Sequence, residues 1–221
     1  MTLVDNSTAK RLGILCFYDK NGRAAKFLDG FLEDLMRNLT DLVVIVNGKI
    51  DDEARKMFGK YTDIIMVREN TGLDVAAYKQ ALLTIGWEKL ETYDEVLCLN
   101  DTVMGPVYPF KEMFETMSRK DVDFWGITAY AGETVNDEKI PTHLQAFHEY
   151  WENMPLWKDY AEVTRKHEMT FTKHFAQLGF KWASYIDWRK YKGYSSYPLL
   201  YMPMQMLRDD RCPVFKRRSF F

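Results

Sequence analysis

Four short apolar runs, each followed by a helical pattern, constrain the fold of this chain more than any other feature. The runs cover residues 12–17, 42–46, 64–67 and 96–99 and have the length of β-strands. Strands that alternate with helices predict parallel pairing through right-handed crossovers. The sequence therefore predicts an α/β fold with a doubly wound, mainly parallel sheet. The accompanying helical patterns cover residues 27–39, 54–58, 75–85 and 110–117.

The region that follows Trp125 departs from this alternation. Residues 123–128 are expected to form a fifth strand and residues 181–186 a returning strand. We expect one long helix over residues 159–178, capped by Gly179, and an irregular tail from Tyr191 onward. Aromatic residues make up 15% of the chain and gather in this helical C-terminal part. They fit either a sugar-binding platform or a core of large side chains.

Length and composition limit the functional class. With 221 residues, 47% of them hydrophobic, the chain can bury one core, and nothing in it resembles a linker. We expect residues 11–221 to form a single domain after a polar, disordered segment over residues 1–10. The net charge of −2, with both signs mixed along the chain, argues against nucleic acid as a partner. Three widely spaced cysteines and the lack of a signal-peptide or membrane-span pattern predict a cytoplasmic protein.

Polar, turn-forming residues follow each of the four predicted strands. They are Tyr18-Asp19, Asn47-Gly48, Arg68-Glu-Asn70 and Asn100-Asp101-Thr102. Ligands of open α/β sheets bind beyond the carboxyl ends of the strands, so these residues should converge on one ligand-binding edge. The glycine-rich dinucleotide motif and the phosphate-binding P-loop motif are both absent from the sequence.

Asp101 and Arg68 are the charged candidates at this edge. A carboxylate at the mouth of a buried strand, as at Asp101, suits a divalent cation that is shared with substrate phosphates. Alternatively, Asp101 only caps the following turn. Arg68 would meet a diphosphate, or it is an ordinary surface arginine. Gly72 permits an unusual backbone angle, and Asp74 is placed to cap the next helix.

Several motifs, taken in order, resemble the rhamnan synthesis protein F family. They are Asn70-x-Gly72-x-Asp74, then Asn100-Asp101-Thr102-x-x-Gly-Pro, then Asp-Phe-Trp-Gly-Ile-Thr over residues 123–128, and His143-Leu-Gln145. That family is associated with rhamnose-containing polysaccharides of bacteria and is related to GT-A-type glycosyltransferases. The resemblance covers roughly residues 12–187. It implies a GT-A-like fold of the kind that binds nucleotide-diphospho-sugars.

The resemblance also assigns roles. Asn100-Asp101 stands in place of the D-x-D motif, so Asp101 would hold a divalent cation, Mn²⁺ or Mg²⁺, or would hydrogen-bond the sugar. Glu168, eleven residues before Gly179, is the candidate base, unless it is a solvated residue on a charged helix face. The implied donor-binding residues are Asn47, Arg68, Asn70, Gly72, Asp74, Asn100 and Thr102, and the implied acceptor-side or sugar-side residues are Trp125, His143 and Gln145.

The function implied is an inverting transfer of a sugar, rhamnose, from a dTDP-type nucleotide donor. The acceptor would be a surface polysaccharide or its lipid-linked precursor at the inner face of the membrane. Residues 216–218 with Phe220 and Phe221 would give peripheral membrane contact, unless they are simply the end of a truncated chain. The alternative is a catalytically silent module of the same fold that binds a nucleotide sugar or a carbohydrate.

Overall fold

The structure, a computed structural model, describes residues 6–129, 143–157, 159–168, 170–195 and 197–219. The chain divides into two compact units. The sheet unit contains Ser7–Asp101 and Leu144–Thr164, and the second unit contains Thr102–His143, Arg165–Phe221 and the N-terminal residues. The single domain over residues 11–221 stays a prediction. Residues 1–5, half of the segment predicted to be disordered, lie outside the described residues.

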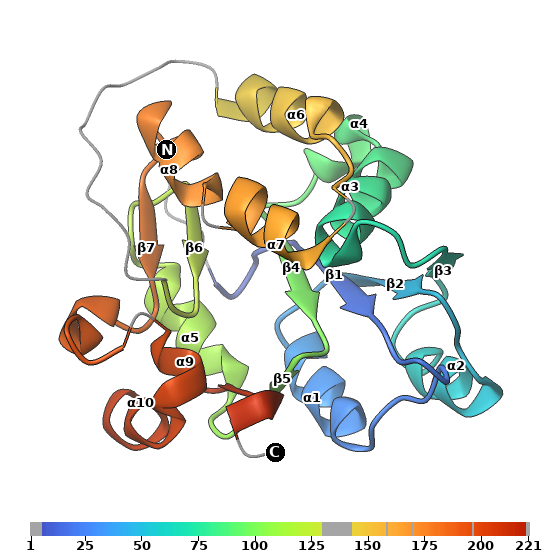
Figure 1. The fold of residues 1–221 in the computed structure, drawn as a ribbon, viewed down its shortest axis with the longest axis horizontal. Helices are drawn as coiled ribbons and strands as arrows, with labels where there is room; N and C mark the ends of the chain where they lie inside the picture. Colours follow the sequence, from blue (N-terminus) through green and yellow to red (C-terminus); the bar gives the residue numbers. More distant parts are fainter. Residues whose placement is uncertain (1–5, 130–142, 158, 169, 196, 220–221) are drawn as a thin grey trace. The chain divides into compact units, whose positions relative to one another are not determined.

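The sheet unit is built on four parallel strands in the order β3-β2-β1-β4. Figure 1 draws α1 and α2 below this sheet and α3 above it. The mixed α/β class and the mainly parallel central sheet are therefore confirmed. The strands are β1 (Arg11–Phe17), β2 (Asp41–Asn47), β3 (Ile65–Arg68) and β4 (Glu95–Asn100), and the helices are α1 (Phe27–Met36), α2 (Asp52–Phe58), α3 (Leu73–Ile85) and α4 (Trp87–Leu90).

Hydrophobic burial explains why these segments form the core of the sheet unit. Every residue of β1 is buried, and β2 is buried from Leu42 to its end, as expected for central strands that are covered on both faces. The rings of Phe17 and Phe58 meet edge to face with their centroids 5.2 Å apart. Helix α1 contributes one apolar face, which consists of Leu28, Phe31, Leu32 and Leu35.

The start of α3 depends on Gly72. This residue is the N-cap and has a left-handed backbone with φ of 69°. A Cβ atom at Gly72 would come within 2.6 Å of the Ala76 Cβ, so only glycine fits without movement. The unusual backbone angle is thus confirmed, whereas the placement of Asp74 as the cap is wrong. Asp74 lies in the first turn of the helix.

Helix α6 (His143–Asn153) and the short α7 (Tyr160–Val163) belong to the sheet unit from Leu144 to Thr164. The Lys79 ammonium on α3 donates to the backbone carbonyls of Glu152 and Met154, at 2.9 and 2.6 Å. The Trp87 ring stacks on the imidazole of His148, with centroids 4.1 Å apart. These contacts fix the C-terminal end of α6 against α3 and α4.

The second unit contains two strand pairs and several short helices. β5 (Val103–Met104) pairs antiparallel with β8 (Phe215–Lys216), and β6 (Phe124–Gly126) pairs parallel with β7 (Trp182–Ser184). The strands expected within residues 123–128 and 181–186 are therefore confirmed in shorter form. The helical segments are α5 (Phe110–Met117), η1 (Thr164–Glu168), α8 (Phe171–Gln177), η2 (Trp188–Tyr191), α9 (Pro198–Tyr201), α10 (Pro203–Asp210) and η3 (Arg217–Ser219).

Two predictions for this part of the chain are wrong. The expected single helix over residues 159–178 is divided into α7, the π-helical η1 and α8, although Gly179 does adopt the left-handed backbone of a helix end. The tail is not irregular, because α9 and α10 begin at Pro198 and Pro203. Proline suits the first turn of a helix, where its missing N–H has no partner to lose.

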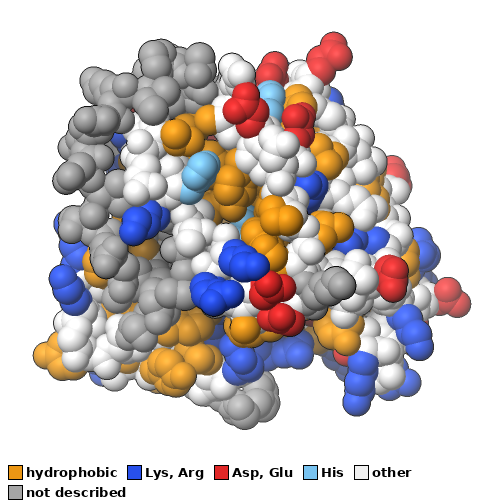
Figure 2. All heavy atoms as spheres, turned by 45° about the horizontal axis from the view of Figure 1, so that its top comes forward, with side chains coloured by type: hydrophobic (Ala, Val, Ile, Leu, Met, Phe, Trp, Pro, Cys, Tyr) orange, Lys and Arg blue, Asp and Glu red, His pale blue; other side chains and the backbone are white. Residues whose placement is uncertain are grey.

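The surface carries charges of both signs. Figure 2 shows Lys and Arg side chains interspersed with Asp and Glu side chains on the face drawn there, among scattered hydrophobic groups. Among the described residues, no helix is both long enough and apolar enough to cross a membrane.

Candidate functional site

The order of the strands places a topological switch point between β1 and β4. The chain adds β2 and β3 on one side of β1, and then returns to add β4 on the other side. Cys16 near the end of β1 lies in register with Asn100 at the end of β4, and Asp101 follows directly. Ligands of open parallel sheets bind at such a point, beyond the carboxyl ends of the strands.

Asn47, at the end of β2, makes contacts with several elements at this edge of the sheet. The side chain is only 2% exposed. Its Nδ2 donates to the backbone carbonyl of Leu73 at 2.9 Å and contacts the Cys16 sulfur at 3.5 Å. Its Oδ1 accepts a hydrogen bond of 2.6 Å from Nη1 of Arg68. One buried amide therefore connects β1, β2, β3 and the first turn of α3.

The Arg68 guanidinium braces the turn between β3 and α3. Besides its bond to Asn47, Arg68 donates from Nε to Oε1 of Gln80 at 2.8 Å and from Nη2 to the carbonyl of Thr71 at 2.9 Å. All three of its nitrogen atoms thus donate to protein acceptors. Arg68 holds the turn that carries Asn70 and Gly72, and Asn70 itself is exposed.

Asn100 connects the end of β4 to the start of α3. Its Nδ2 donates to Oδ2 of Asp74 at 2.8 Å, and its side chain also hydrogen-bonds the buried hydroxyl of Tyr78. The backbone N–H of Val75 donates to Oδ1 of Asp74 at 3.0 Å. Tyr78 was not predicted from the sequence, although its spacing of four residues from Asp74 on a helix places both on one face.

Two carboxylates, not one, lie near the end of β1. Asp101 is 8% exposed. Burial, followed by the negative charges of Asp74 and Asp101, raises the pKa of the Cys16 thiol, so both carboxylates lie near this sulfur. Two carboxylates and an amide form a suitable set of oxygen donors for Mg²⁺ or Mn²⁺. In the described part of the chain, no group of three or more His, Cys, Asp or Glu side chains is arranged to hold a metal ion.

Thr102, in the second unit, has a basic neighbour. Its Oγ1 accepts a hydrogen bond of 2.8 Å from the Lys216 ammonium, and its carbonyl accepts one of 3.0 Å from the N–H of Arg217. The pairing of Val103 with Lys216 across β5 and β8 fixes this arrangement. The strand pairing brings the basic segment of residues 216–218 beside the residue that follows Asp101 in the chain.

The remaining predicted residues are distributed over both units. Trp125 lies on β6 in the second unit and packs edge to face on Phe114, at 5.6 Å between centroids. Glu168 is exposed at the end of η1 in the same unit. Gln145 lies on α6 in the sheet unit and donates to Oε1 of Glu149 at 2.7 Å. His143 begins α6, and its side chain lies outside the described structure.

Comparison with known proteins supports the resemblance seen in the motifs. The family model for rhamnan synthesis protein F matches residues 42–221. An uncharacterized protein, y4gN, of Sinorhizobium fredii (strain NBRC 101917 / NGR234) is 25% identical over 186 residues, which cover 76% of this chain and 46% of that protein. The chain thus spans about half the length of this curated relative. No solved structure matches the chain.

The matched region contains every predicted site residue, from Asn47 at the end of β2 to Glu168 in η1. The family model covers most of the chain, including the sheet strands from β2 onward and the second unit from Thr102 onward. This chain therefore belongs to the rhamnan synthesis protein F family.

Proposed function

We propose that this chain is a GT-A-like glycosyltransferase that moves rhamnose from a nucleotide-diphosphate donor, such as dTDP-rhamnose, to a bacterial polysaccharide or its lipid-linked precursor. The observation that carries the proposal is the pairing of Asp74 with Asn100, beside the buried Asp101, at the switch point of the sheet. Family membership supports the reaction class. Two acidic side chains at this point suit a diphosphate only when a cation lies between them and the phosphates.

The donor would lie along the edge built by Asn47, Arg68, Asn70, Gly72 and Asn100. The hydrogen bonds of Asn47 and Arg68 hold the turn before α3 in place, so the backbone that faces the nucleotide is arranged before the donor binds. Asp101 and Asp74 would hold a divalent cation, Mn²⁺ or Mg²⁺. When bound, this cation supplies positive charge to the oxygens of the leaving diphosphate.

Thr102 remains a proposed donor-binding residue. Residues 216–218, with Phe220 and Phe221, remain the proposed point of peripheral membrane contact.

The acceptor hydroxyl needs a base in an inverting transfer. Glu168 remains the proposed base, and Trp125, His143 and Gln145 remain the proposed acceptor-side or sugar-side residues. Glu168 is exposed and therefore accessible to a hydroxyl. With a lipid-linked acceptor, the reaction would take place at the inner face of the membrane, through peripheral association.

The test is transfer by the purified chain, with dTDP-rhamnose, Mn²⁺ and rhamnose-containing oligosaccharide acceptors, measured as release of dTDP. The wild type should release dTDP. The rate of release should be at least about a hundredfold lower in Asp101→Asn, because the isosteric amide removes one negative charge from the diphosphate site. Glu88→Gln makes the same change at an exposed residue of α4 and should leave the rate unchanged.

Two outcomes would contradict the proposal. If the wild type binds the donor but transfers sugar to none of the acceptors, the chain is a silent module that binds nucleotide sugars. If Asp101→Asn is as active as the wild type, the donor site lies elsewhere in the molecule.

A further inference from the structure

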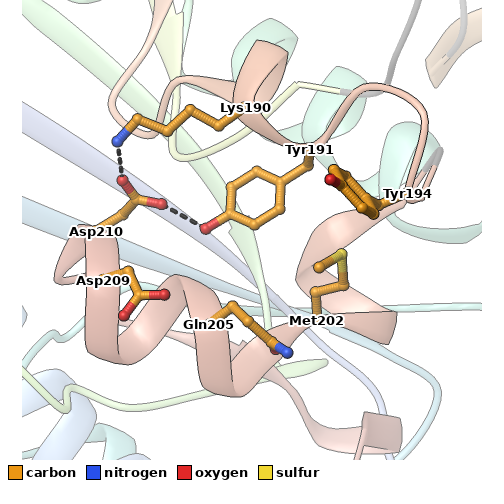
Figure 3. Close-up of a pocket in the computed structure, with 7 residues that line it drawn as sticks. All are labelled: Lys190, Tyr191, Tyr194, Met202, Gln205, Asp209 and Asp210. Carbon is orange, nitrogen blue, oxygen red and sulfur yellow. Dashed lines mark hydrogen bonds and ion pairs between the residues drawn. The ribbon is translucent and has the colours of Figure 1, made fainter.

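A small pocket in the second unit lies within residues 190–210, outside every residue assigned to the proposed transfer. It holds about 260 Å³, somewhat below the roughly 300–1,000 Å³ of pockets for drug-sized ligands. Figure 3 shows Tyr194 and Met202 on one side of it, with Gln205 and Asp209 of α10 on another. A nucleotide sugar is too large for this volume, whereas a single sugar ring fits.

The apolar wall of the pocket is unusually open to solvent. Tyr194 is 81% exposed, the largest value among the exposed large hydrophobic residues of the described chain. The Tyr194 N–H donates to the carbonyl of Tyr191 at 3.0 Å, and Gly193, with φ of 93°, allows the tight turn that presents the ring. An aromatic face beside a thioether offers the flat apolar surface on which the C–H groups of a sugar ring stack.

Polar groups around the pocket match the hydroxyls of a sugar. No hydrogen bond of the Tyr194 hydroxyl or the Gln205 amide to the rest of the described structure is seen, so both have donors and acceptors to offer. Arg208 holds the Asp209 carboxylate at 2.6 and 3.0 Å, through both of its oxygens. A carboxylate so fixed keeps lone pairs for neighbouring hydroxyls.

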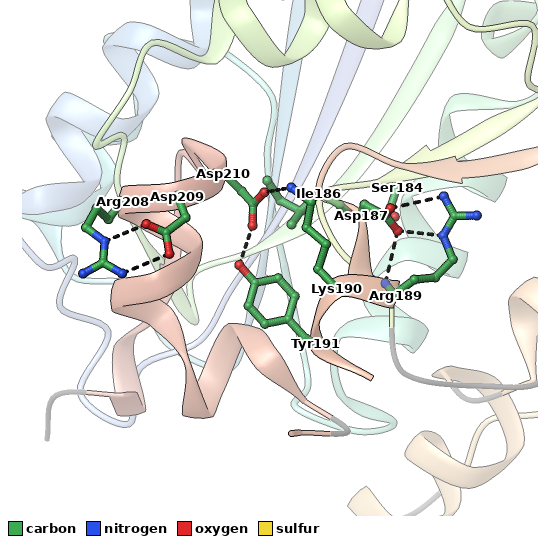
Figure 4. A network of polar contacts seen from close by, with 9 residues as sticks. All are labelled: Ser184, Ile186, Asp187, Arg189, Lys190, Tyr191, Arg208, Asp209 and Asp210. Carbon is green, nitrogen blue, oxygen red and sulfur yellow. Dashed lines mark hydrogen bonds and ion pairs between the residues drawn. The ribbon is translucent and has the colours of Figure 1, made fainter. Parts of the chain in front are cut away.

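The side of the pocket at Asp210 is rigid. Figure 4 shows the Asp210 carboxylate bound by both the Lys190 ammonium and the Tyr191 hydroxyl. The Tyr191 ring, which is only 6% exposed, is therefore held in one orientation against the cavity. A wall that is ordered before the ligand arrives reduces the entropy cost of binding.

The charged rim favours a sugar over a protein partner. Two ion pairs, Lys190 with Asp210 and Arg208 with Asp209, border the pocket. A protein that covered this face would remove water from both pairs, which is costly, and charged residues are depleted at the cores of protein interfaces. The hydroxyls of a sugar would instead replace the water molecules around these charges.

We propose that this pocket binds one neutral pyranose unit of a glycan, with the ring on Tyr194 and its hydroxyls on Gln205 and Asp209. The site would hold a glycan at a point separate from the donor residues. This proposal does not depend on the proposed transfer reaction. The transfer only suggests rhamnose as the sugar to use as a probe.

The test is the binding of methyl α-L-rhamnopyranoside to the purified full chain, measured by saturation-transfer difference NMR without donor, cation or acceptor. Tyr194→Ala should weaken binding by about tenfold, Gln205→Ala should weaken it by about fivefold, and Tyr194→Phe, which keeps the ring, should bind within about threefold of the wild type. Tyr201→Ala removes a tyrosine that is 71% exposed but does not line the pocket, and it should bind as the wild type does.

The thermal unfolding midpoint of each variant shows that it is folded, which we expect since Tyr194 and Gln205 are exposed. The proposal is overturned if the wild type binds no rhamnoside up to its solubility, or if Tyr194→Ala and Tyr201→Ala bind equally well. Neither result depends on transfer activity, so failure here and failure of the proposed transferase remain distinguishable.

Discussion

Replacing Asn47 by alanine should destabilise the sheet unit and loosen the turn before α3. Asn47 is buried and makes two strong hydrogen bonds, one to the Leu73 carbonyl at 2.9 Å and one from the Arg68 guanidinium at 2.6 Å. Loss of the amide leaves the Leu73 carbonyl without this donor, which costs about 1–3 kcal/mol of stability. It also removes the hydrogen bond from the charged Arg68 guanidinium, which contributes about 1.5–3 kcal/mol. We expect a total of about 3–5 kcal/mol, a large fraction of the roughly 5–15 kcal/mol that stabilises a domain.

Urea unfolding followed by circular dichroism measures this loss as a lower midpoint at unchanged slope. Gln80→Ala is the matched control, because it removes only the exposed bond from Arg68 Nε and should cost about 0.5–1 kcal/mol. A loss below about 1 kcal/mol in Asn47→Ala would refute the idea that this amide holds the edge of the sheet together.

Two further stability predictions follow from the backbone and from burial. Gly72→Ala should cost about 2–3 kcal/mol in thermal unfolding, because φ is positive at this residue and its Cβ would lie within 2.6 Å of the Ala76 Cβ. A cost below about 1 kcal/mol would contradict this. Burial lowers the pKa of His167 to about 4 from its ordinary 6.5. As the pH falls, the unfolded state therefore binds a proton at this imidazole before the folded state does. The free energy of unfolding should fall by about 3 kcal/mol between pH 7 and pH 4. The prediction would be disproved if an NMR titration gave the His167 imidazole an ordinary pKa. It would also be disproved if the unfolding free energy of His167→Gln fell as steeply between pH 7 and pH 4 as that of the wild type.

The four strands of the sheet unit and its helices α1, α2 and α3 were predictable because each is marked by a strong pattern. The four apolar runs lie within a residue or two of β1 to β4, and parallel pairing then requires their carboxyl ends to share one edge. The buried start of β1 was not predictable, since Arg11 is charged. It is buried because Glu95 of β4 pairs with it across the sheet.

The site was only partly predictable, because some of its contacts depend on turns and on distant pairing. Asp74 reaches Asn100 only after the left-handed turn at Gly72 has set the direction of α3, which residue spacing does not specify. Lys216 lies 114 residues from Thr102, and the two-residue strands that join them carry no periodic signal. The helices of the tail were missed because prolines were read as breaks, although they also start helices.

Equilibrium binding of dTDP with Mn²⁺ tests the central claim, that Asp101 and Asp74 form the donor site, most directly. Isothermal titration calorimetry would compare the wild type with Asp101→Asn, Asp74→Asn and the control Glu88→Gln. We predict that binding requires Mn²⁺ and weakens by about tenfold to a hundredfold in either site variant, while the control binds as the wild type does. Unchanged dTDP affinity in both Asp101→Asn and Asp74→Asn would contradict this assignment.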